Sequence, residues 1–451
     1  MGKITRSVFA AKNNIMKTSK MVIVGAGSIF FTRAVAVGMC QDPQFRGATL
    51  SLVDTNPEML DVMARLCQRI IRETGADLKL EATADRKVAF RNADFVVLSF
   101  SVRGVDLRET DTVIPARYGV RQCSGDSIGP GGLFRALRTI PIILEMARDM
   151  EAICPQAWVF NYVNPTTLMG AALSRYTRLK TIAICDGIVL PEAKLAMLDR
   201  VGIPRARADE VVMKLGGVNH FSWVTEFRDG AKDLRPELLR SLKAQPEAHA
   251  GKAVAQILEV FGWYSPIGGH MVEFLPYFQG HGLNPQESYV NHIFEIAERR
   301  KWMRLFNEEI RRQAAGQEPI DKLIAETKPD LVIHLAHSAL HNAGATHFVN
   351  FPNHGHIPNL PDGATIELPA RIYADRYEGE IFGEMPPVLR SWLLRIIDTQ
   401  ELTLEAAVTG NRKTLRQALV ADPLTVSIED ADHIIDELFK AEHDDLPPLW
   451  R

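Results

Sequence analysis

The sequence is poor in cysteine and lacks a C-x-x-C pair. Its 451 residues include five cysteines, an odd number: Cys40, Cys67, Cys123, Cys154 and Cys185. This pattern argues against a disulfide framework and for a reducing compartment, so we expect a cytoplasmic protein.

Neither sign of charge dominates, and no long apolar run is present. The 52 Lys and Arg residues nearly balance the 55 Asp and Glu residues. Such a balance gives no electrostatic footprint for nucleic acid or for an anionic membrane surface. Charge or proline interrupts every apolar run before membrane-spanning length, so we predict neither a membrane nor a nucleic-acid partner.

The first 20 residues are basic and carry no acid. Their cations are Lys3, Arg6, Lys12, Lys17 and Lys20. An organellar transit peptide can have this composition. We favour a disordered leader over residues 1–20, ahead of the folded chain.

From residue 21 onward, apolar strand patterns alternate with amphipathic helix patterns. Strands are expected over 21–28, 49–54, 93–100, 158–162 and 180–185, and helices over 59–74 and 133–152. This alternation predicts an α/β fold, with a Rossmann-type doubly wound parallel sheet over residues 21–200 that binds NAD. In such sheets, ligands bind beyond the carboxyl ends of the strands.

The β/α alternation ends near residue 200. Helical patterns near 252–261, 286–300, 301–314 and 385–420 indicate a second, α+β domain over 201–451. We expect it to complete the active site, to hold substrate and metal, and to form a homodimer or homotetramer.

A glycine-rich turn follows the first strand. Gly25, Gly27, Ser28 and Ile29 belong to it, but position 30 holds Phe instead of the third glycine of the dinucleotide fingerprint. Asp54 ends the next strand, where a carboxylate binds ribose hydroxyls and disfavours a 2′-phosphate. The pattern therefore predicts NAD over NADP, the alternative being a doubly wound fold with unused glycines.

A thiol and an imidazole occur where ligands are expected. Cys185 ends the predicted strand over 180–185, and His220 follows Gly216, Gly217 and Asn219. A lone cysteine is usually a small buried hydrophobe, and a lone histidine is usually a hydrogen-bonded polar residue. Together, thiolate and imidazole suit Mn²⁺ or another divalent transition metal.

Asp186 follows the thiol directly. If Cys185 faces a metal, Asp186 lies in the same cleft and is a candidate general acid. The alternative is a cap on a helix that begins at Gly187.

Several spaced motifs resemble those of glycoside hydrolase family 4, whose members depend on NAD and a divalent metal. They are the segments 124–141, 161–165 and 349–361, together with Cys185 and the pair Asn219-His220. The resemblance extends over nearly the whole chain. It implies a glycosidase without the usual pair of catalytic carboxylates.

The resemblance also implies a mechanism. NAD⁺ oxidises C3 of the sugar, which acidifies the C2 proton, and the metal stabilises the enediolate. A base removes that proton, and the leaving group departs from C1 with help from a general acid.

Carried onto this chain, the resemblance implies that Cys185 and His220 bind the metal and that Asp186 is the acid. Tyr264 is the candidate base. The resemblance and its surroundings also nominate substrate-binding residues, of which the first is expected to contact the cofactor as well: Asn164, Asn219, His270 and Arg103.

We therefore predict a glycosidase that cleaves an unphosphorylated α-hexoside, a glucoside or a galactoside. Arg103 leaves open an anionic sugar, whether uronic, sulfo or 6-phospho, although a structural salt bridge is the simpler role for it. A 2-hydroxy-acid dehydrogenase of the same superfamily is a further alternative.

Overall fold

A computed structural model describes residues 18–122, 125, 127–244, 249–278 and 296–451. Most of the leader predicted over residues 1–20 lies outside this part of the chain, and the first strand begins at Lys20. The predicted helix over 286–300 also lies largely outside it.

Six parallel strands form the N-terminal half of a larger sheet, in the order β3-β2-β1-β4-β5-β6. They are β1 (Lys20–Val24), β2 (Thr49–Val53), β3 (Lys79–Thr83), β4 (Phe95–Leu98), β5 (Trp158–Asn161) and β6 (Lys180–Ala183). Strands β2 and β3 lie on one side of β1, and β4 to β6 lie on the other. The strand order reverses at β1, and a crevice for ligands opens at that point.

Except at the edge strand β3, which is mostly exposed, both faces of this half-sheet are buried because neighbouring residues of a strand enter different cores. In β1, Met21 and Ile23 belong to one apolar cluster, and Val22 and Val24 belong to the other. The first cluster includes α1 (Phe31–Gln41), α2 (Pro57–Thr74) and α13 (Leu331–His341). The second includes α5 (Gly129–Ile153) and α6 (Thr166–Tyr176). Continuous apolar strands are typical of a parallel sheet covered on both faces.

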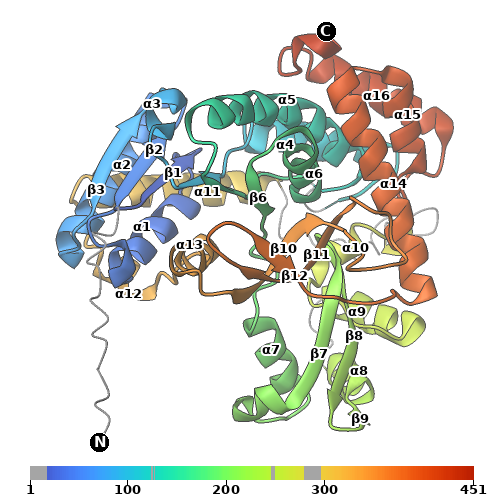
Figure 1. Ribbon diagram of the computed structural model, residues 1–451. Coiled ribbons are helices and arrows are strands. Elements are labelled where there is room, and N and C mark those ends of the chain that lie inside the picture. The colour runs from blue at the N-terminus through green and yellow to red at the C-terminus, as the bar shows by residue number, and fades with distance from the viewer. Residues whose placement is uncertain (1–17, 123–124, 126, 245–248, 279–295) are drawn as a thin grey trace, which may run out of the picture.

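The sheet continues into an antiparallel half with the order β10-β11-β7-β8-β9 after β6. These strands are β7 (Val211–Val218), β8 (Phe221–Asp229), β9 (Lys232–Asp233), β10 (Ala345–Pro352) and β11 (Thr365–Ile372), with β12 (Tyr377–Gly379) paired to β11. Figure 1 shows β7 and β8 extending away from the parallel strands as a long hairpin. The predicted α/β fold, with its doubly wound sheet and second α+β part, is confirmed.

Most remaining helices surround the two halves of the sheet. They are α3 (Arg86–Phe90), α4 (Val105–Arg117), α7 (Glu192–Arg200), α8 (Arg235–Ala244), α9 (His249–Phe261), α10 (Gly269–Val272), α11 (Ile296–Ala314) and α12 (Asp321–Glu326). None of the helices in the described ranges is both long and apolar enough to cross a membrane.

The last three helices return to the N-terminal half and pack over α5 and α6 (Figure 1). The single helical segment predicted near 385–420 is two helices, α14 (Pro387–Thr409) and α15 (Arg412–Ala421). Gly410 ends α14 with a left-handed φ of 71°, and the Asn411 side chain caps α15. A left-handed glycine terminates a helix because it has no Cβ to clash. The third helix is α16 (Ile428–Ala441).

Asp422 holds the C-terminal helices against the start of α5. Its carboxylate accepts hydrogen bonds from the backbone N–H groups of Gly129, at 2.8 Å, and Leu424, at 2.9 Å. Burial raises the pKa of Asp422 to about 6, although these two bonds and Arg395 oppose the shift.

This pKa predicts a pH-dependent stability. The folded-state pKa of Asp422 lies above the unfolded value. The contribution of this residue to the free energy of unfolding is therefore fully present below about pH 4 and is lost as pH rises through about 6. At about 1.4 kcal/mol per pKa unit, the loss is about 3 kcal/mol. Asp422→Asn should remove this pH dependence and add a constant penalty, because the amide N–H₂ faces a backbone donor. Thermal melts of both proteins from pH 4 to pH 7 measure the difference.

The exposed Asp436 of α16 provides the control. Asp436→Asn should track the wild type at every pH. Parallel melting curves for wild type and Asp422→Asn would contradict the proposed role of the buried carboxylate.

Candidate active site and dinucleotide cleft

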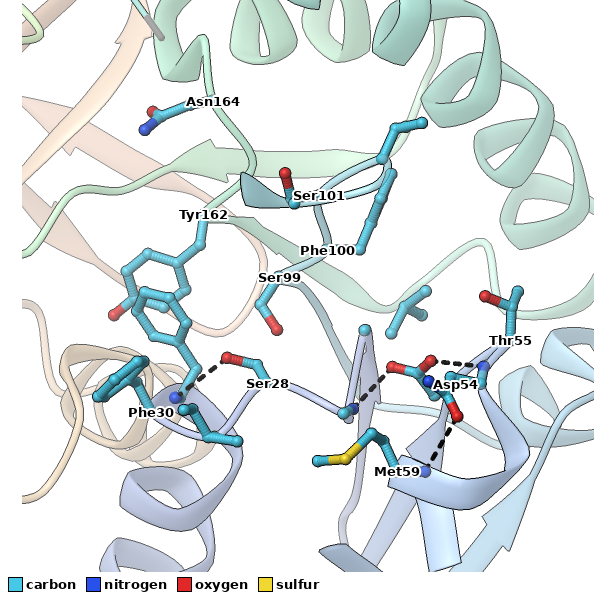
Figure 2. Close-up of a pocket in the computed structure, with 18 of the residues that line it drawn as sticks. Ser28, Phe30, Asp54, Thr55, Met59, Ser99, Phe100, Ser101, Tyr162 and Asn164 are labelled. Atoms are coloured by element: carbon cyan, nitrogen blue, oxygen red, sulfur yellow. Dashed lines mark hydrogen bonds between the residues drawn. The ribbon is translucent and has the colours of Figure 1, made fainter. Parts of the chain in front are cut away.

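A cleft of about 1660 Å³ opens at the carboxyl ends of the parallel strands. Figure 2 shows Asp54 and Met59 at one part of its wall, with Tyr162 and Asn164 at another. Eleven of the predicted site residues line this cleft: Gly25, Gly27, Ser28, Ile29, Asp54, Arg103, Asn164, Cys185, Asp186, His220 and His270. The structure thus brings together residues from both halves of the sequence.

The glycine turn is held by β2 and by Asp54. The N–H groups of Gly25 and Ala26 both donate to the Val53 carbonyl at 2.9 Å, and Gly27 N–H donates to the Asp54 carboxylate at 2.7 Å (Figure 2). Gly25 has a φ of 90°, and a Cβ there would lie 2.7 Å from the Phe100 Cβ. Only glycine fits this position without strain.

Cys185 and His220 come from different strands and meet in the cleft. Each lies two residues beyond a strand end, Cys185 after β6 and His220 after β7. The Cys185 Sγ is 3.2 Å from His220 Nε2, and Ser127 Oγ is 2.9 Å from His220 Nδ1. If Nδ1 carries the proton, Ser127 accepts it and Nε2 keeps its lone pair free to bind a ligand.

The turn that carries His220 is held by a buried glutamate that the sequence analysis missed. Glu367 of β11 accepts hydrogen bonds from Asn219 Nδ2 at 2.9 Å, Ser222 Oγ at 2.7 Å and Asn350 Nδ2 at 3.1 Å. It is only 3% exposed. The sequence signal was a lone acid between the apolar residues Ile366 and Leu368 of a strand.

Glu367 also lies next to the junction of the two half-sheets, because it pairs with Asn350 of β10, the strand that meets β6. Its backbone pairs β11 to β7 opposite Gly217, and Asn350 pairs β10 to β6 opposite Ala183. Each is the one residue pair that joins its two strands within the described part of the chain. Asn350 Nδ2 reaches both the Ala183 carbonyl and Glu367, so this side chain bridges the junction.

The environment of Cys185 disfavours a bare thiolate. Burial raises its pKa well above the usual range, and the carboxylates of Glu367 and Asp186 raise it further. Hydrogen bonds from the Gly187 N–H and the Asn219 side chain oppose the shift. A thiolate here therefore needs a compensating positive charge, which a metal ion supplies.

Asp186 lies near a half-buried acid, Asp330, that the sequence analysis also missed. Tyr162 donates its hydroxyl to Asp330 at 2.6 Å, and burial raises the pKa of Asp330, with Asp186 contributing. Both Tyr162 and Asp330 line the cleft with Asp186. No helix begins at Gly187; the next one, α7, starts at Glu192, so the alternative role of Asp186 as a helix cap is wrong.

Tyr264 lies outside the main cleft, in a neighbouring cavity of about 790 Å³. Asp186, Tyr162 and Asp330 line both cavities and stand between them. Tyr264 is nearly buried, and burial raises the pKa of its hydroxyl.

The remaining predicted residues have varied settings. Asn219 does not line the cleft; it is buried, and it connects Glu367 to the turn before His220. His270 stacks on His220 at 4.5 Å. Arg103 forms an ion pair with Asp445 at 2.8 Å, while its side chain remains 57% exposed at the cleft.

Asn164 contributes to the cleft through both its backbone and its side chain. Its carbonyl accepts from Arg135 Nε at 3.2 Å, and its Oδ1 accepts from the Thr166 hydroxyl at 2.6 Å. Across the described ranges, no group of three or more His, Cys, Asp or Glu side chains converges as a metal site. A metal held by Cys185 and His220 therefore needs further ligands from substrate or water.

Two family models match the chain. Residues 20–200 match the family 4 glycosyl hydrolases, and residues 215–425 match the C-terminal domain of the same family. An α-galactosidase of Bacillus subtilis is 30% identical over 435 residues, which cover 95% of this chain and 99% of the relative. The chain belongs to glycosyl hydrolase family 4.

Relatives of this family 4 glycosidase differ in the sugars that their names give. An α-galacturonidase of Bacillus subtilis is 27% identical, with 93% of this chain and 97% of the relative covered. A 6-phospho-α-glucosidase from gut microorganisms, solved with NAD and Mn²⁺, has a TM-score of 0.81 at 21% identity over 96% of this chain and 99% of its own. The predicted family and glycosidase activity are confirmed, and the dehydrogenase alternative is not retained.

Glu367 should support both stability and the position of His220. Glu367→Gln replaces an acceptor oxygen by a donor among three donors, so we expect the free energy of unfolding to fall by about 2–4 kcal/mol. Chemical denaturation measures this change. Glu378→Gln, on the exposed β12, should change it by less than about 0.5 kcal/mol. Equal stability of the two variants would contradict the role of the Glu367 cluster.

Proposed function

We propose that the chain is an NAD- and Mn²⁺-dependent glycosidase that cleaves an unphosphorylated α-hexoside, a glucoside or a galactoside. The observation that carries the proposal is the 3.2 Å approach of Cys185 Sγ to His220 Nε2 within the cleft that also holds the glycine turn and Asp54. Two metal-binding side chains and a dinucleotide turn in one cleft fit redox-assisted elimination better than acid–base hydrolysis alone.

The donor pair fits one divalent ion. The 3.2 Å separation of Cys185 Sγ and His220 Nε2 is short enough for a single ion to contact both donors. Sulfur and imidazole donors suit a transition metal, and the contact of Ser127 with Nδ1 orients the ring.

The cleft also fits NAD. Asp54 directly follows β2, where it faces the cleft and supports the glycine turn through Gly27. A carboxylate at this place binds the ribose hydroxyls and repels a 2′-phosphate. The structurally similar 6-phospho-α-glucosidase was solved with NAD and Mn²⁺, which supports the same pair of cofactors here.

NAD bound in the cleft would supply the hydride acceptor for oxidation at C3 of the sugar, and a bound metal would supply Lewis acidity for the charge that develops when C2 loses its proton. Cys185 and His220 hold the metal, and Asp186 donates a proton to the oxygen that leaves C1. Tyr264 is the proposed base at C2. This role requires the sugar to extend toward the neighbouring cavity, which Asp186 also lines. Deprotonation of Tyr264 would have to overcome the burial that raises its pKa.

The sugar itself is proposed to contact Asn164, His270 and Arg103, with Asn219 acting by positioning the turn. A second candidate, a glycosidase for an anionic sugar, is favoured by the exposed Arg103 at the cleft and by the α-galacturonidase relative. The ion pair with Asp445 already neutralises Arg103, which favours the neutral sugar.

We also propose domains over 21–200 and 201–451, a cytoplasmic location, and a homodimer or homotetramer. Tyr277 is 63% exposed and Ile381 is 71% exposed in the second half of the chain. Side chains of this kind mark an interface where they gather in one contiguous patch, which a second copy of the chain would cover.

Cys185→Ser should abolish Mn²⁺ retention while NAD still binds. The hydroxyl is a far weaker ligand than a thiolate, so we expect glycosidase activity to fall at least about a hundredfold. Nitrophenyl glycoside turnover, Mn²⁺ by equilibrium dialysis and NAD binding measure the three properties.

Cys40→Ser, on α1, is the matched control and should keep activity, metal and NAD. Full activity of Cys185→Ser after chelation would rule out the metal role. In D₂O, the wild type should incorporate deuterium at C2 of the product sugar, and its absence would contradict the elimination route.

A substrate panel separates the two candidate sugars. Nitrophenyl α-glucosides and α-galactosides should be cleaved at least about tenfold faster than their uronic or 6-phospho counterparts, since a charged group without a dedicated partner is costly to desolvate. Asp445→Asn removes the acid that neutralises Arg103, and it should raise kcat/KM for uronides only. Faster cleavage of uronides by the wild type would establish the second candidate.

A further inference from the structure

We propose that α11 (Ile296–Ala314), from the second half of the chain, forms a wall of the dinucleotide site and retains NAD between turnovers. This inference rests on the proposed function, because it takes NAD as the occupant of the cleft. Figure 1 places α11 among elements of the N-terminal half. It contacts α2 and α4, which follow two of the strands whose carboxyl ends form the cleft.

One face of α11 lines the cleft. Positions 299, 303, 307 and 311 are four residues apart and position 302 is three after 299, which is the spacing of a single helix face. They are Arg299, Trp302, Met303, Asn307 and Arg311. Four of these residues are polar or aromatic, whereas Met303 packs against the apolar core, and the five extend over nearly the whole helix.

An aromatic contact joins α11 to the glycine turn. Trp302 stacks on Phe30 with ring centroids 5.0 Å apart and ring planes 12° from parallel, and Phe306 packs against both. Phe30 occupies the position of the missing third glycine. The departure from the dinucleotide fingerprint is thus the residue through which the turn contacts α11. Trp302 is still 45% exposed, so its ring is accessible from the cleft.

Ion pairs hold both ends of α11. Near its start, Arg300 pairs with Asp106 and Glu109 of α4, each at 2.6 Å. Near its end, Arg311 pairs with Glu58 of α2 at 2.6 Å.

The C-terminal end of α11 is anchored further by Arg69 of α2. One Arg69 nitrogen donates to the carbonyls of Gln313 and Glu318, each at 2.6 Å. The helix is therefore fastened across the cleft, on one side to α4 and on the other to α2.

The α2 end of α11 adjoins the adenosine side of the site. Arg311 Nη2 lies 3.4 Å from the Met59 sulfur, and a Cβ on Gly27 would lie 3.2 Å from the Met59 Cβ. Asp54, the proposed ribose ligand, contacts the same glycine. Arg311 and Asn307 therefore face the adenosine half of the coenzyme, and Trp302 faces the glycine turn that supports its pyrophosphate.

Retention of the coenzyme by α11 suits the proposed reaction. The hydride taken from C3 returns to the sugar, so the coenzyme ends each turnover in its starting redox state and needs no exchange. A dehydrogenase must release its reduced coenzyme every cycle, whereas this enzyme gains from retaining it.

Release of NADH tests the role of α11. The fluorescence of bound NADH is followed after a chase with excess NAD⁺, using the full-length protein. Trp302→Ala should release NADH about fivefold to tenfold faster, since the aromatic contact is lost. The double variant Arg300→Ala/Arg311→Ala should release it about threefold to tenfold faster, as expected for exposed ion pairs.

Two variants control for general effects. Arg304→Ala changes an exposed residue outside the cleft-lining face and should match the wild type. Trp302→Phe keeps an aromatic ring and should stay within about twofold. If circular dichroism shows that Trp302→Ala is unfolded, the NADH release rate of the Arg300→Ala/Arg311→Ala variant tests the role of α11.

NADH binding with equal release rates in all variants would overturn the role of α11 alone. A wild type that binds neither NAD⁺ nor NADH would overturn the proposed function and this inference with it.

Discussion

The site depends on the buried carboxylate of Glu367. Within the described residues, one pair, Asn350 with Ala183, joins the antiparallel half-sheet to the parallel one, and one pair, Glu367 with Gly217, joins β11 to β7. Backbone hydrogen bonds alone therefore define the relative positions of these strands weakly. Glu367 adds three side-chain hydrogen bonds within the antiparallel half, and its partner Asn350 also donates to the Ala183 carbonyl across the junction. Because β6 leads to Cys185 and β7 leads to His220, the same cluster sets the distance between sulfur and imidazole. A buried charge with several donors is costly to disturb, which makes it an effective positioning device.

The two sides of the cleft are held in place differently: one consists of strand ends, and the other is α11. Strands β2, β5 and β6 are buried on both faces, so the strand ends that lead to Asp54, Asn164 and Cys185 are held by two cores. Helix α11 is held by exposed ion pairs to α4 and α2 and by one aromatic stack on Phe30 of the glycine turn. Exposed ion pairs are individually weak, so the position of α11 depends on several of them acting together with the aromatic stack.

Local patterns predicted much of this protein, and the exceptions have physical causes. The glycine turn, Asp54, Cys185, Asp186 and His220 were found because strand ends in a doubly wound sheet share one edge. The helix near 385–420 divides because Gly410 adopts a left-handed conformation, which apolar periodicity does not report. Other residues reach the site by pairings distant in sequence: Glu367 through β11, Asp330 through Tyr162, and α11 through Phe30.

The sequence by itself determined the fold class, the dinucleotide turn and the residue types that suit a metal, because periodicity and strand-end chemistry are local properties. Only the tertiary structure decided that Cys185 and His220 lie 3.2 Å apart, that Tyr264 faces a neighbouring cavity, and that Asn219 supports the turn rather than lining the cleft. These arrangements arise from contacts between strands and helices far apart in the chain. Packing geometry sets such contacts, and no local pattern encodes it.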